Sequence, residues 1–369
     1  MNKNLEMNVA KILKASEAKS LEDCSLSLKS GYLVSFPTET VYGLGAHAFD
    51  EKALEQIFFA KGRPKSDPLI VHISELAQAE SLTEMSAFQR QCFDALGKAF
   101  WPGPLTIIVK AAQKVPKIVT AGGDAIAIRI PAGKIALRLL KLANIPVAAP
   151  SANKFGHVSP TKAKHVFDDL GHVPDLTILE NDQDCDIGIE STVIKITNEN
   201  EIHLLRPGFI STLQISKVLE ENNISCEIKK IRKVVREHDL LTKHLDAPGQ
   251  LLTHYAPEIE TFILISQNNL IHENIQKFSS SMLNKTVLID FNKKNIVFSN
   301  KVLKYFDLSE NGDTIEASKN LFNLLRESEV FPNAEYILLP DFSKENSEEL
   351  LAIFDRIYRA ASGKFVRIS

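Results

Sequence analysis

The feature that most constrains the fold is a tight turn that follows a short apolar segment near the amino terminus. Residues 32–36 form an apolar run, which predicts a buried strand. Residues 37–45 then hold one proline, two glycines, two threonines and one glutamate, a composition that indicates a turn. In α/β sheets, ligands bind beyond the carboxyl ends of the strands. The sequence therefore predicts a ligand-binding turn in an α/β protein.

Two cations follow this turn along the chain. Lys61 and Arg63 end a predicted helix over residues 52–61, and Pro64 is expected to stop that helix. Two interpretations of Lys61 and Arg63 are possible. They are either solvated charges that complement the helix dipole or a binding site for phosphate oxygens. The hydroxyl-bearing turn upstream and the Ser-x-Asn turn at 151–153 favour the phosphate site.

Length and composition narrow the class of protein. A chain of 369 residues is expected to hold two domains. Net charge is −3, and the absence of a basic excess argues against binding nucleic acid through charge. The four cysteines lack metal-ligand spacing and are predicted to be buried free thiols. No signal peptide or membrane-length apolar run is found, so we expect a cytoplasmic enzyme with no membrane contact.

Predicted strands and helices alternate along the chain, which indicates an α/β fold in both halves. In the first half, strands are expected at 32–36, 69–73, 105–110, 125–131, 191–196 and 202–205, and helices at 17–30, 52–61, 87–100, 135–143 and 161–169. In the last third, strands are expected at 261–266, 286–290, 296–298 and 336–339, and helices at 268–278, 314–326 and 347–361.

The turn, the Lys-x-Arg pair at 61–63 and the Ser-x-Asn pair at 151–153 together resemble the YrdC-type domain of L-threonylcarbamoyladenylate synthases. The later part of the chain resembles the extra domain of the long, two-domain form of that family. The resemblance implies a twisted open α/β sheet with a pocket over residues 10–222. It also implies an ordered linker over 223–257 and a smaller Rossmann-like domain with a parallel α/β sheet over 258–369.

The same resemblance implies which residues bind ATP, and it assigns Lys61 and Arg63 a catalytic role. Asp67 falls where the family often has asparagine, and an aspartate cannot donate a hydrogen bond as asparagine does. Ser159 is expected to bind the nucleotide, to cap the helix that follows, or both. The implied ATP-binding residues are Lys61, Arg63, Asp67, Ser151, Asn153, Ser159, Arg206 and Tyr255.

A second group of residues is implied to bind threonine. His72 lies inside an apolar strand, where a histidine is often only a satisfied core residue. Arg129 also lies inside a strand, and a buried arginine needs an anionic partner. That partner is either the carboxylate of the substrate or a structural salt bridge. The implied threonine-binding residues are Thr40, His72, Arg129, Ala149 (through backbone atoms) and Ser191.

The implied reaction joins L-threonine, bicarbonate and ATP into threonylcarbamoyl-AMP and pyrophosphate, which makes the chain a nucleotidyltransferase. Mg²⁺ is expected on the phosphates, with no protein residues dedicated to the metal. A separate transferase is expected to carry the product to tRNA adenosine, and tRNA contact is expected to be weak at most. Two alternatives stay open: an RNA-binding translation or ribosome-assembly module with the same fold, and a carbamoyl-transfer enzyme that uses another acceptor.

The linker has two segments of unusual composition. The basic residues between 229 and 236 are expected to form a solvated face, with an RNA contact as the alternative. The segment His254-Tyr255-Ala256-Pro257 is unlike a flexible tether rich in glycine and serine. We expect this segment to dock across the mouth of the first domain's pocket and to exclude water from the acyl-adenylate.

Overall fold

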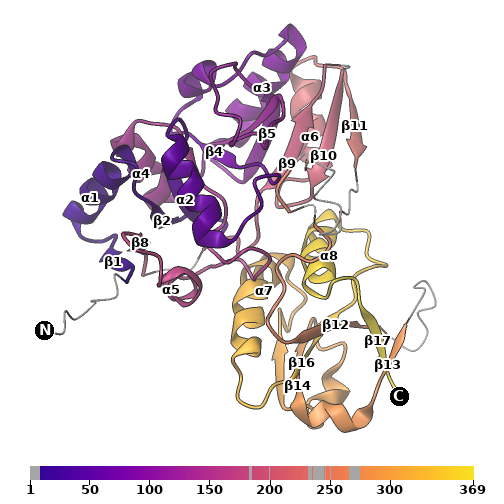
Figure 1. Ribbon diagram of the computed structural model, residues 1–369. Coiled ribbons are helices and arrows are strands. Elements are labelled where there is room, and N and C mark those ends of the chain that lie inside the picture. Colours follow the sequence, from indigo (N-terminus) through magenta and orange to yellow (C-terminus); the bar gives the residue numbers. More distant parts are fainter. Residues whose placement is uncertain are drawn as a thin grey trace, which may run out of the picture.

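The computed structural model describes residues 9–182, 185–198, 200–231, 235, 245, 247–249, 251–265 and 275–369. Figure 1 shows two α/β units, a larger one drawn in indigo to pink and a smaller one drawn in orange to yellow. Each unit has its own sheet, and the helices α7 and α8 lie where the two units meet. Within the described ranges, no helix is long and apolar enough to cross a membrane.

The larger unit is built on a mixed sheet of eleven described strands in the order β1-β8-β2-β3-β7-β4-β6-β5-β9-β10-β11. The strands are β1 (Lys11–Lys14), β2 (Val34–Pro37), β3 (Tyr42–His47), β4 (Ile70–His72), β5 (Leu105–Lys110), β6 (Ala125–Arg129), β7 (Val147–Ala148), β8 (Thr177–Glu180), β9 (Thr192–Ile196), β10 (Glu201–Arg206) and β11 (Glu227–Lys230). Its helices are α1 (Ala18–Lys29), α2 (Glu51–Lys61), η1 (Leu76–Ser81), α3 (Ala87–Phe100), α4 (Lys134–Ala143), α5 (Ala163–Leu170) and α6 (Thr212–Glu221).

Local sequence signals explain where several of these helices begin and end. A capping box of Ser86 and Gln89 starts α3. The carboxylate of Asp50 accepts two backbone hydrogen bonds at the start of α2. Gly62 ends α2 in the left-handed conformation, at φ 64°. The stop therefore comes from Gly62, two residues before the predicted Pro64, because glycine adopts a positive φ at little cost.

The smaller unit contains six described strands in the order β13-β17-β12-β16-β14-β15, and every neighbouring pair runs parallel. This arrangement confirms the predicted Rossmann-like sheet. The strands are β12 (Glu260–Leu264), β13 (Gln276–Phe278), β14 (Thr286–Asp290), β15 (Lys304–Asp307), β16 (Tyr336–Pro340) and β17 (Phe365–Ile368). The helices are η3 (Ser280–Lys285), η4 (Ile296–Phe298), α7 (Thr314–Glu329) and α8 (Glu348–Ala360).

Two predictions for this unit are wrong. Residues 296–298 form a short 3₁₀ helix, η4, and not a strand. The side chains of Ile296 and Val297 are 44% and 71% exposed, so these residues are not a buried apolar segment. The predicted helix over 268–278 ends in a strand, because 276–278 pair with β17. The residues 268–274 of that prediction lie outside the described residues.

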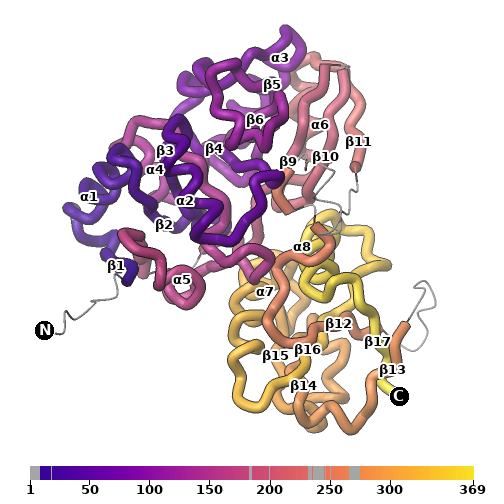
Figure 2. Tube along the Cα trace, viewed as in Figure 1, coloured from indigo at the N-terminus to yellow at the C-terminus, as the bar shows by residue number. Residues whose placement is uncertain are grey.

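The two units share apolar packing and buried polar contacts. Val41 from the first turn and Ile189 belong to the same hydrophobic cluster as the core of the smaller unit. Figure 2 shows α7 beside α5 and α8 below β9 and β10. On α7, Arg326 pairs with Asp169 of α5 at 2.9 Å. Because both apolar and charged groups cross the boundary, the smaller unit is positioned against the larger one by specific contacts.

Candidate functional site

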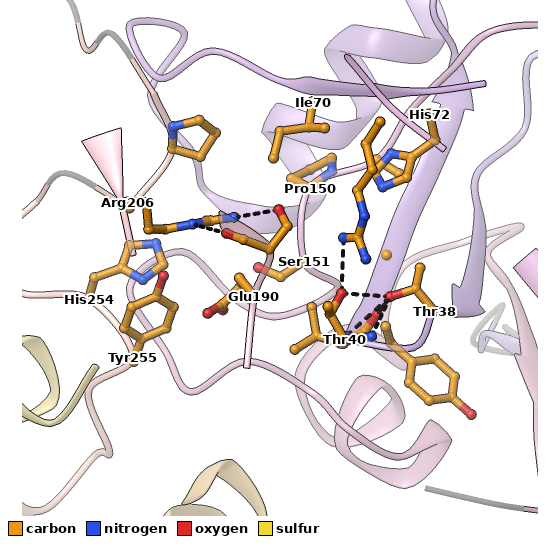
Figure 3. Close-up of a pocket in the computed structure, with 18 of the residues that line it drawn as sticks. Thr38, Thr40, Ile70, His72, Pro150, Ser151, Glu190, Arg206, His254 and Tyr255 are labelled. Atoms are coloured by element: carbon orange, nitrogen blue, oxygen red, sulfur yellow. Dashed lines mark hydrogen bonds between the residues drawn. The ribbon is translucent and has the colours of Figure 1, made fainter. Parts of the chain in front are cut away.

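A pocket lies between the larger sheet, the first turn and the segment that leads into the smaller unit (Figure 3). Several of its walls come from residues at the ends of strands. The empty space between its walls, including the part open to solvent, is about 540 Å³. The lining residues are Thr38, Thr40, Val41, Tyr42, Gly43, Arg63, Ile70, His72, Arg129, Ala149, Pro150, Ser151, Glu190, Ser191, Arg206, Pro248, Gly249, His254 and Tyr255.

The first turn is held by its own hydroxyl groups. The hydroxyl of Thr38 donates to the carbonyl of Val41 at 2.6 Å and lies 2.9 Å from the hydroxyl of Thr40. Figure 3 shows these two threonines on one side of the pocket. Thr40 has no exposed surface. The turn therefore presents a fixed hydroxyl to the pocket, as its threonines predicted.

Arg129 ends β6 and faces this turn. Its Nη1 donates to the hydroxyl of Thr40 at 3.0 Å, and its Nη2 pairs with Glu39 at 2.6 Å. Burial disfavours the Glu39 carboxylate, but the charge of Arg129 and the hydrogen bonds to the carboxylate together outweigh it and lower the pKa of Glu39. The salt bridge that the sequence left open as an alternative is therefore present. Arg129 also lines the pocket, so the salt bridge does not remove it from the site.

His72 ends β4 beside Arg129, its neighbour in the β4–β6 register. Burial, and then the charge of Arg129, lowers the pKa of His72 to about 3, so its ring is neutral near neutral pH. Nδ1 of His72 is buried and finds no hydrogen-bond partner among the described residues. An unsatisfied buried nitrogen on a pocket wall can bond to a ligand.

Lys61 and Arg63 are almost completely buried, with 4% and 7% exposure, so they are not solvated charges at a helix end. Nζ of Lys61 donates to the carbonyl oxygens of Ser151, at 2.6 Å, and Asn153. Arg63 lines the pocket and pairs with Asp67 at 3.0 Å. Burial raises the pKa of Asp67 and lowers that of Lys61. The two predicted motifs, Lys-x-Arg and Ser-x-Asn, are thus in direct contact.

Ser191 and Arg206 form another wall. Arg206 ends β10, and its guanidinium donates to the carbonyl and to the hydroxyl of Ser191, both at 3.1 Å. The hydroxyl of Ser191 also lies 2.7 Å from that of Thr106. Arg206 is 5% exposed and Ser191 is fully buried. This wall brings a buried cation and a hydroxyl group together at the pocket.

Glu190 is a pocket residue that the sequence analysis missed. Its carboxylate accepts a hydrogen bond from the hydroxyl of Ser159 at 2.6 Å and pairs with Arg356 of α8 at 3.2 Å. Ser159 is thereby bonded to Glu190, and it does not cap α5, whose N-cap is Lys162. An acidic residue next to the apolar Ile189 was the available signal, but its partner lies 166 residues away.

The linker segment closes the remaining side of the pocket. His254 and Tyr255 line it with their rings 4.1 Å apart, and Figure 3 shows them beside Arg206. Tyr255 is fully buried and has a positive φ of 60°, a conformation that costs energy in a residue other than glycine. Its hydroxyl has no hydrogen-bond partner within the part of the chain that the structure describes. The segment therefore docks at the pocket, as its composition predicted.

The pocket thus gathers most of the predicted site residues on its walls: Thr40, Arg63, His72, Arg129, Ala149, Ser151, Ser191, Arg206 and Tyr255. The remaining four lie behind the walls in contact with lining residues or with one another: Lys61, Asp67, Asn153 and Ser159. Across the described ranges, no cluster of three or more His, Cys, Asp or Glu side chains is suited to a metal ion.

The fold and the pocket define a two-unit α/β protein with a cationic, hydroxyl-lined binding site. The family described as "Telomere recombination" (Sua5_yciO_yrdC) matches residues 27–208, and "Threonylcarbamoyl-AMP synthase, C-terminal domain" matches residues 210–362. The chain belongs to the threonylcarbamoyl-AMP synthase family.

Relatives from distant organisms match nearly the whole chain. The Threonylcarbamoyl-AMP synthase of Pyrococcus abyssi is 34% identical, with 92% of this chain and 94% of the relative covered. That of Bacillus subtilis is 35% identical, with 92% of each chain covered. The crystal structure of P. abyssi Sua5 complexed with L-threonine matches with a TM-score of 0.77 at 31% identity, over 98% of this chain and 100% of the other.

Proposed function

We propose that the chain is a threonylcarbamoyl-AMP synthase that makes threonylcarbamoyl-AMP and pyrophosphate from L-threonine, bicarbonate and ATP. The observation that carries this proposal is the convergence of Arg63, Arg129 and Arg206 on one pocket, with Lys61 behind it. These four cations come from the end of α2, from β6 and from β10, and they are 4–7% exposed. Arg129 and Arg63 already pair with Glu39 and Asp67. Lys61 and Arg206 bond only to carbonyl and hydroxyl groups among the described residues. Burying these two charges is costly without anionic partners, and the phosphates of ATP would supply them. The relatives named above carry the same activity in their names.

The threonine side of the site would be built on β4, β6 and the first turn. Arg129 would bind the substrate carboxylate, and the neutral ring of His72 would accept or donate a hydrogen bond through its unsatisfied Nδ1. Thr40 and Ser191 would offer hydroxyl groups, and Ala149 would contribute backbone atoms. Such fixed partners orient the amine for reaction.

The nucleotide side would be built on α2, the Ser-x-Asn turn, β10 and the linker. Lys61, Arg63 and Arg206 would neutralise the phosphates, and we assign Lys61 and Arg63 the catalytic role. Ser151, Asn153, Ser159 and Asp67 would complete this side. The unbonded hydroxyl of Tyr255 would contact the nucleotide as the linker closes over it.

The reaction proceeds in two steps. The amine of threonine captures bicarbonate to give a carbamate, with loss of water. A carbamate oxygen then attacks the α-phosphorus of ATP, and pyrophosphate leaves with the electron pair of the broken P–O bond. The protein contributes positioning and cations for the charge that develops on the phosphate oxygens. The reaction makes the chain a nucleotidyltransferase.

Mg²⁺ would enter with ATP. The carboxylates near the pocket are already paired, Glu39 with Arg129, Asp67 with Arg63 and Glu190 with Arg356. The described residues therefore offer no free carboxylate cage, and the metal would be held by phosphate oxygens and water. We further propose that the enzyme acts in the cytoplasm and that a separate transferase carries the product to tRNA adenosine, with little tRNA contact by this chain.

The product itself tests this function. The protein would be incubated with ATP, Mg²⁺, L-threonine and ¹³C-bicarbonate, and the products identified by mass spectrometry. The proposal expects threonylcarbamoyl-AMP that carries the heavy carbon. Formation of AMP or ADP without a labelled conjugate would reject it.

A further inference from the structure

We propose that Arg356, on α8 of the smaller unit, is a positioning residue for the active site of the larger unit. Its side chain is 0% exposed and forms an ion pair with Glu190, which lines the pocket. The proposal rests on the function proposed above and extends it to a residue that the sequence did not single out. It makes the smaller unit a structural part of the catalytic site.

The first contact of Arg356 is with Glu190. Nε of the guanidinium lies 3.2 Å from the carboxylate, and Nη2 donates to the backbone carbonyl of the same residue, also at 3.2 Å. The carboxylate accepts its other hydrogen bond from Ser159. Glu190 is 6% exposed, so without Arg356 its charge would be buried with one neutral partner. An uncompensated buried charge is expected to move toward water or to take up a proton.

The second contact is with the other wall of the same site. Nη1 of Arg356 donates to the carbonyl of Pro207, the residue after Arg206. Arg206 in turn holds the carbonyl and hydroxyl of Ser191, the residue after Glu190. One guanidinium thus bonds to Glu190, directly before Ser191, and to Pro207, directly after Arg206. These contacts close a ring that fixes the hydroxyl and the cation relative to each other.

Two features indicate that Arg356 positions the pocket walls and does not only fill space at the interface between the units. Arg356 also donates to Ala352 within α8, so the helix fixes the guanidinium from behind. The surrounding segments are tight, since a side chain at Gly208 would meet the backbone nitrogen of Thr192 at 2.4 Å. Neighbouring residues therefore leave little free space around these two pocket walls. A small displacement of one wall would move Ser191 or Arg206.

The predicted consequence is kinetic. Ser191 is on the proposed threonine side and Arg206 on the proposed ATP side, so loss of Arg356 should raise KM for both substrates. A defect confined to folding lowers the concentration of active enzyme, which reduces the apparent kcat and leaves both KM values unchanged. The two KM values thus separate positioning from stability.

The test compares full-length variants under conditions where each is folded by circular dichroism. Arg356→Ala is expected to raise both KM values and to lower kcat/KM at least tenfold. Arg356→Lys is expected to recover only part of this loss, because one ammonium cannot reproduce a planar fork with several fixed donors. The matched control is Glu348→Ala, on the same helix, which breaks the contacts of Glu348 with Thr212 and Lys230 across the interface. That variant should keep wild-type KM values.

A double-mutant cycle adds a second measure. Glu190→Gln keeps the shape of the side chain and removes its charge. If Arg356 acts through Glu190, the losses in kcat/KM of the two single variants will not add in the double variant. Unchanged KM values in folded Arg356→Ala, or additive losses, would overturn the proposal. A wild-type protein that forms no threonylcarbamoyl-AMP would instead reject the proposed function itself.

Discussion

Buried charge at single residues explains most of the chemistry we assign to this site. Lys61→Met removes an ammonium group and its bonds to Ser151 and Asn153 while keeping most of the side-chain volume. We expect pyrophosphate release to fall about 100-fold or more, because a cation that stabilises the developing phosphate charge is lost. The free energy of unfolding in urea should fall by about 1–3 kcal/mol, because two carbonyls lose their partner.

The matched control for this prediction is Lys65→Met. The side chain of Lys65 is 63% exposed and pairs only with the exposed Glu55 among the described residues. An exposed pair of this kind contributes little to stability. Both the rate of pyrophosphate release and the unfolding free energy should stay at wild-type values. A Lys61 variant that behaved like this control would contradict the phosphate assignment.

The buried His72 predicts how stability depends on acid. Its pKa is about 3 in the folded protein and near 6.5 when unfolded, so the unfolded state binds the proton more readily. As pH falls below 6.5 toward 3, His72 should therefore lower the free energy of unfolding by roughly 1.4 kcal/mol per pH unit. Urea denaturation of His72→Asn from pH 7 to 4.5 should show a shallower decline than wild type.

At the scale of elements, the linker segment is shaped by close contact with the pocket. Gly249 has a φ of +83°, and a side chain there would lie 3.0 Å from the hydroxyl of Tyr255. Gly249→Ala should displace Tyr255 and raise KM for ATP several-fold. Gly312→Ala carries a similar backbone cost at φ +74° and meets only the side chain of Asn292, which does not line the pocket, so KM for ATP should not change. Equal KM values in the two variants would count against a nucleotide contact by Tyr255.

The elements that could be predicted from sequence are those with local signals. The helix over 87–100 has a capping box at its start and an apolar face, and both are visible within one segment. The segment at 296–298 looked like a strand because it is apolar, but its side chains are largely exposed. The composition of a short segment does not show whether its side chains are exposed, because tertiary packing determines which side chains are buried.

Prediction of the site residues from sequence is limited in the same way, because some of them are defined only by tertiary contacts. The Lys-x-Arg and Ser-x-Asn motifs can be recognised in the sequence alone. In the structure, Lys61 of the first motif donates a hydrogen bond to the carbonyl of Ser151 in the second. Glu190 could not be found in this way, because its role depends on Arg356, which is distant in sequence. The residues that we propose to bind ligands lie in recognisable motifs, whereas Arg356, which we propose to position them, depends on contacts made only in the assembled fold.

At the scale of the whole molecule, a cluster around His157 joins the two units. Its ring bonds to Asp169 of α5 and Glu329 of α7 at 2.9 and 3.0 Å. Burial opposes the charged ring, but the bonds to these two carboxylates outweigh it and raise the pKa of His157 to about 9. The cation therefore stabilises the folded state fully below pH 6.5, and this contribution is lost as pH rises through 9.

This cluster predicts the alkaline side of the stability profile. Wild-type unfolding free energy should fall by roughly 1.4 kcal/mol per pH unit through this window from His157 alone. His157→Gln should flatten that decline, and Glu329→Gln should reproduce part of the flattening. A profile between pH 6.5 and 9 that is the same in wild type and His157→Gln would show that the histidine is not held charged in the folded protein.

In the proposed function, one pocket brings together threonine, bicarbonate and ATP. The most direct measurement is pyrophosphate release from ATP with each of the other substrates omitted in turn. We predict rapid release only when threonine and bicarbonate are both present, and loss of that release in Lys61→Met. Release at the same rate without threonine, or without bicarbonate in carefully degassed buffer, would contradict the account.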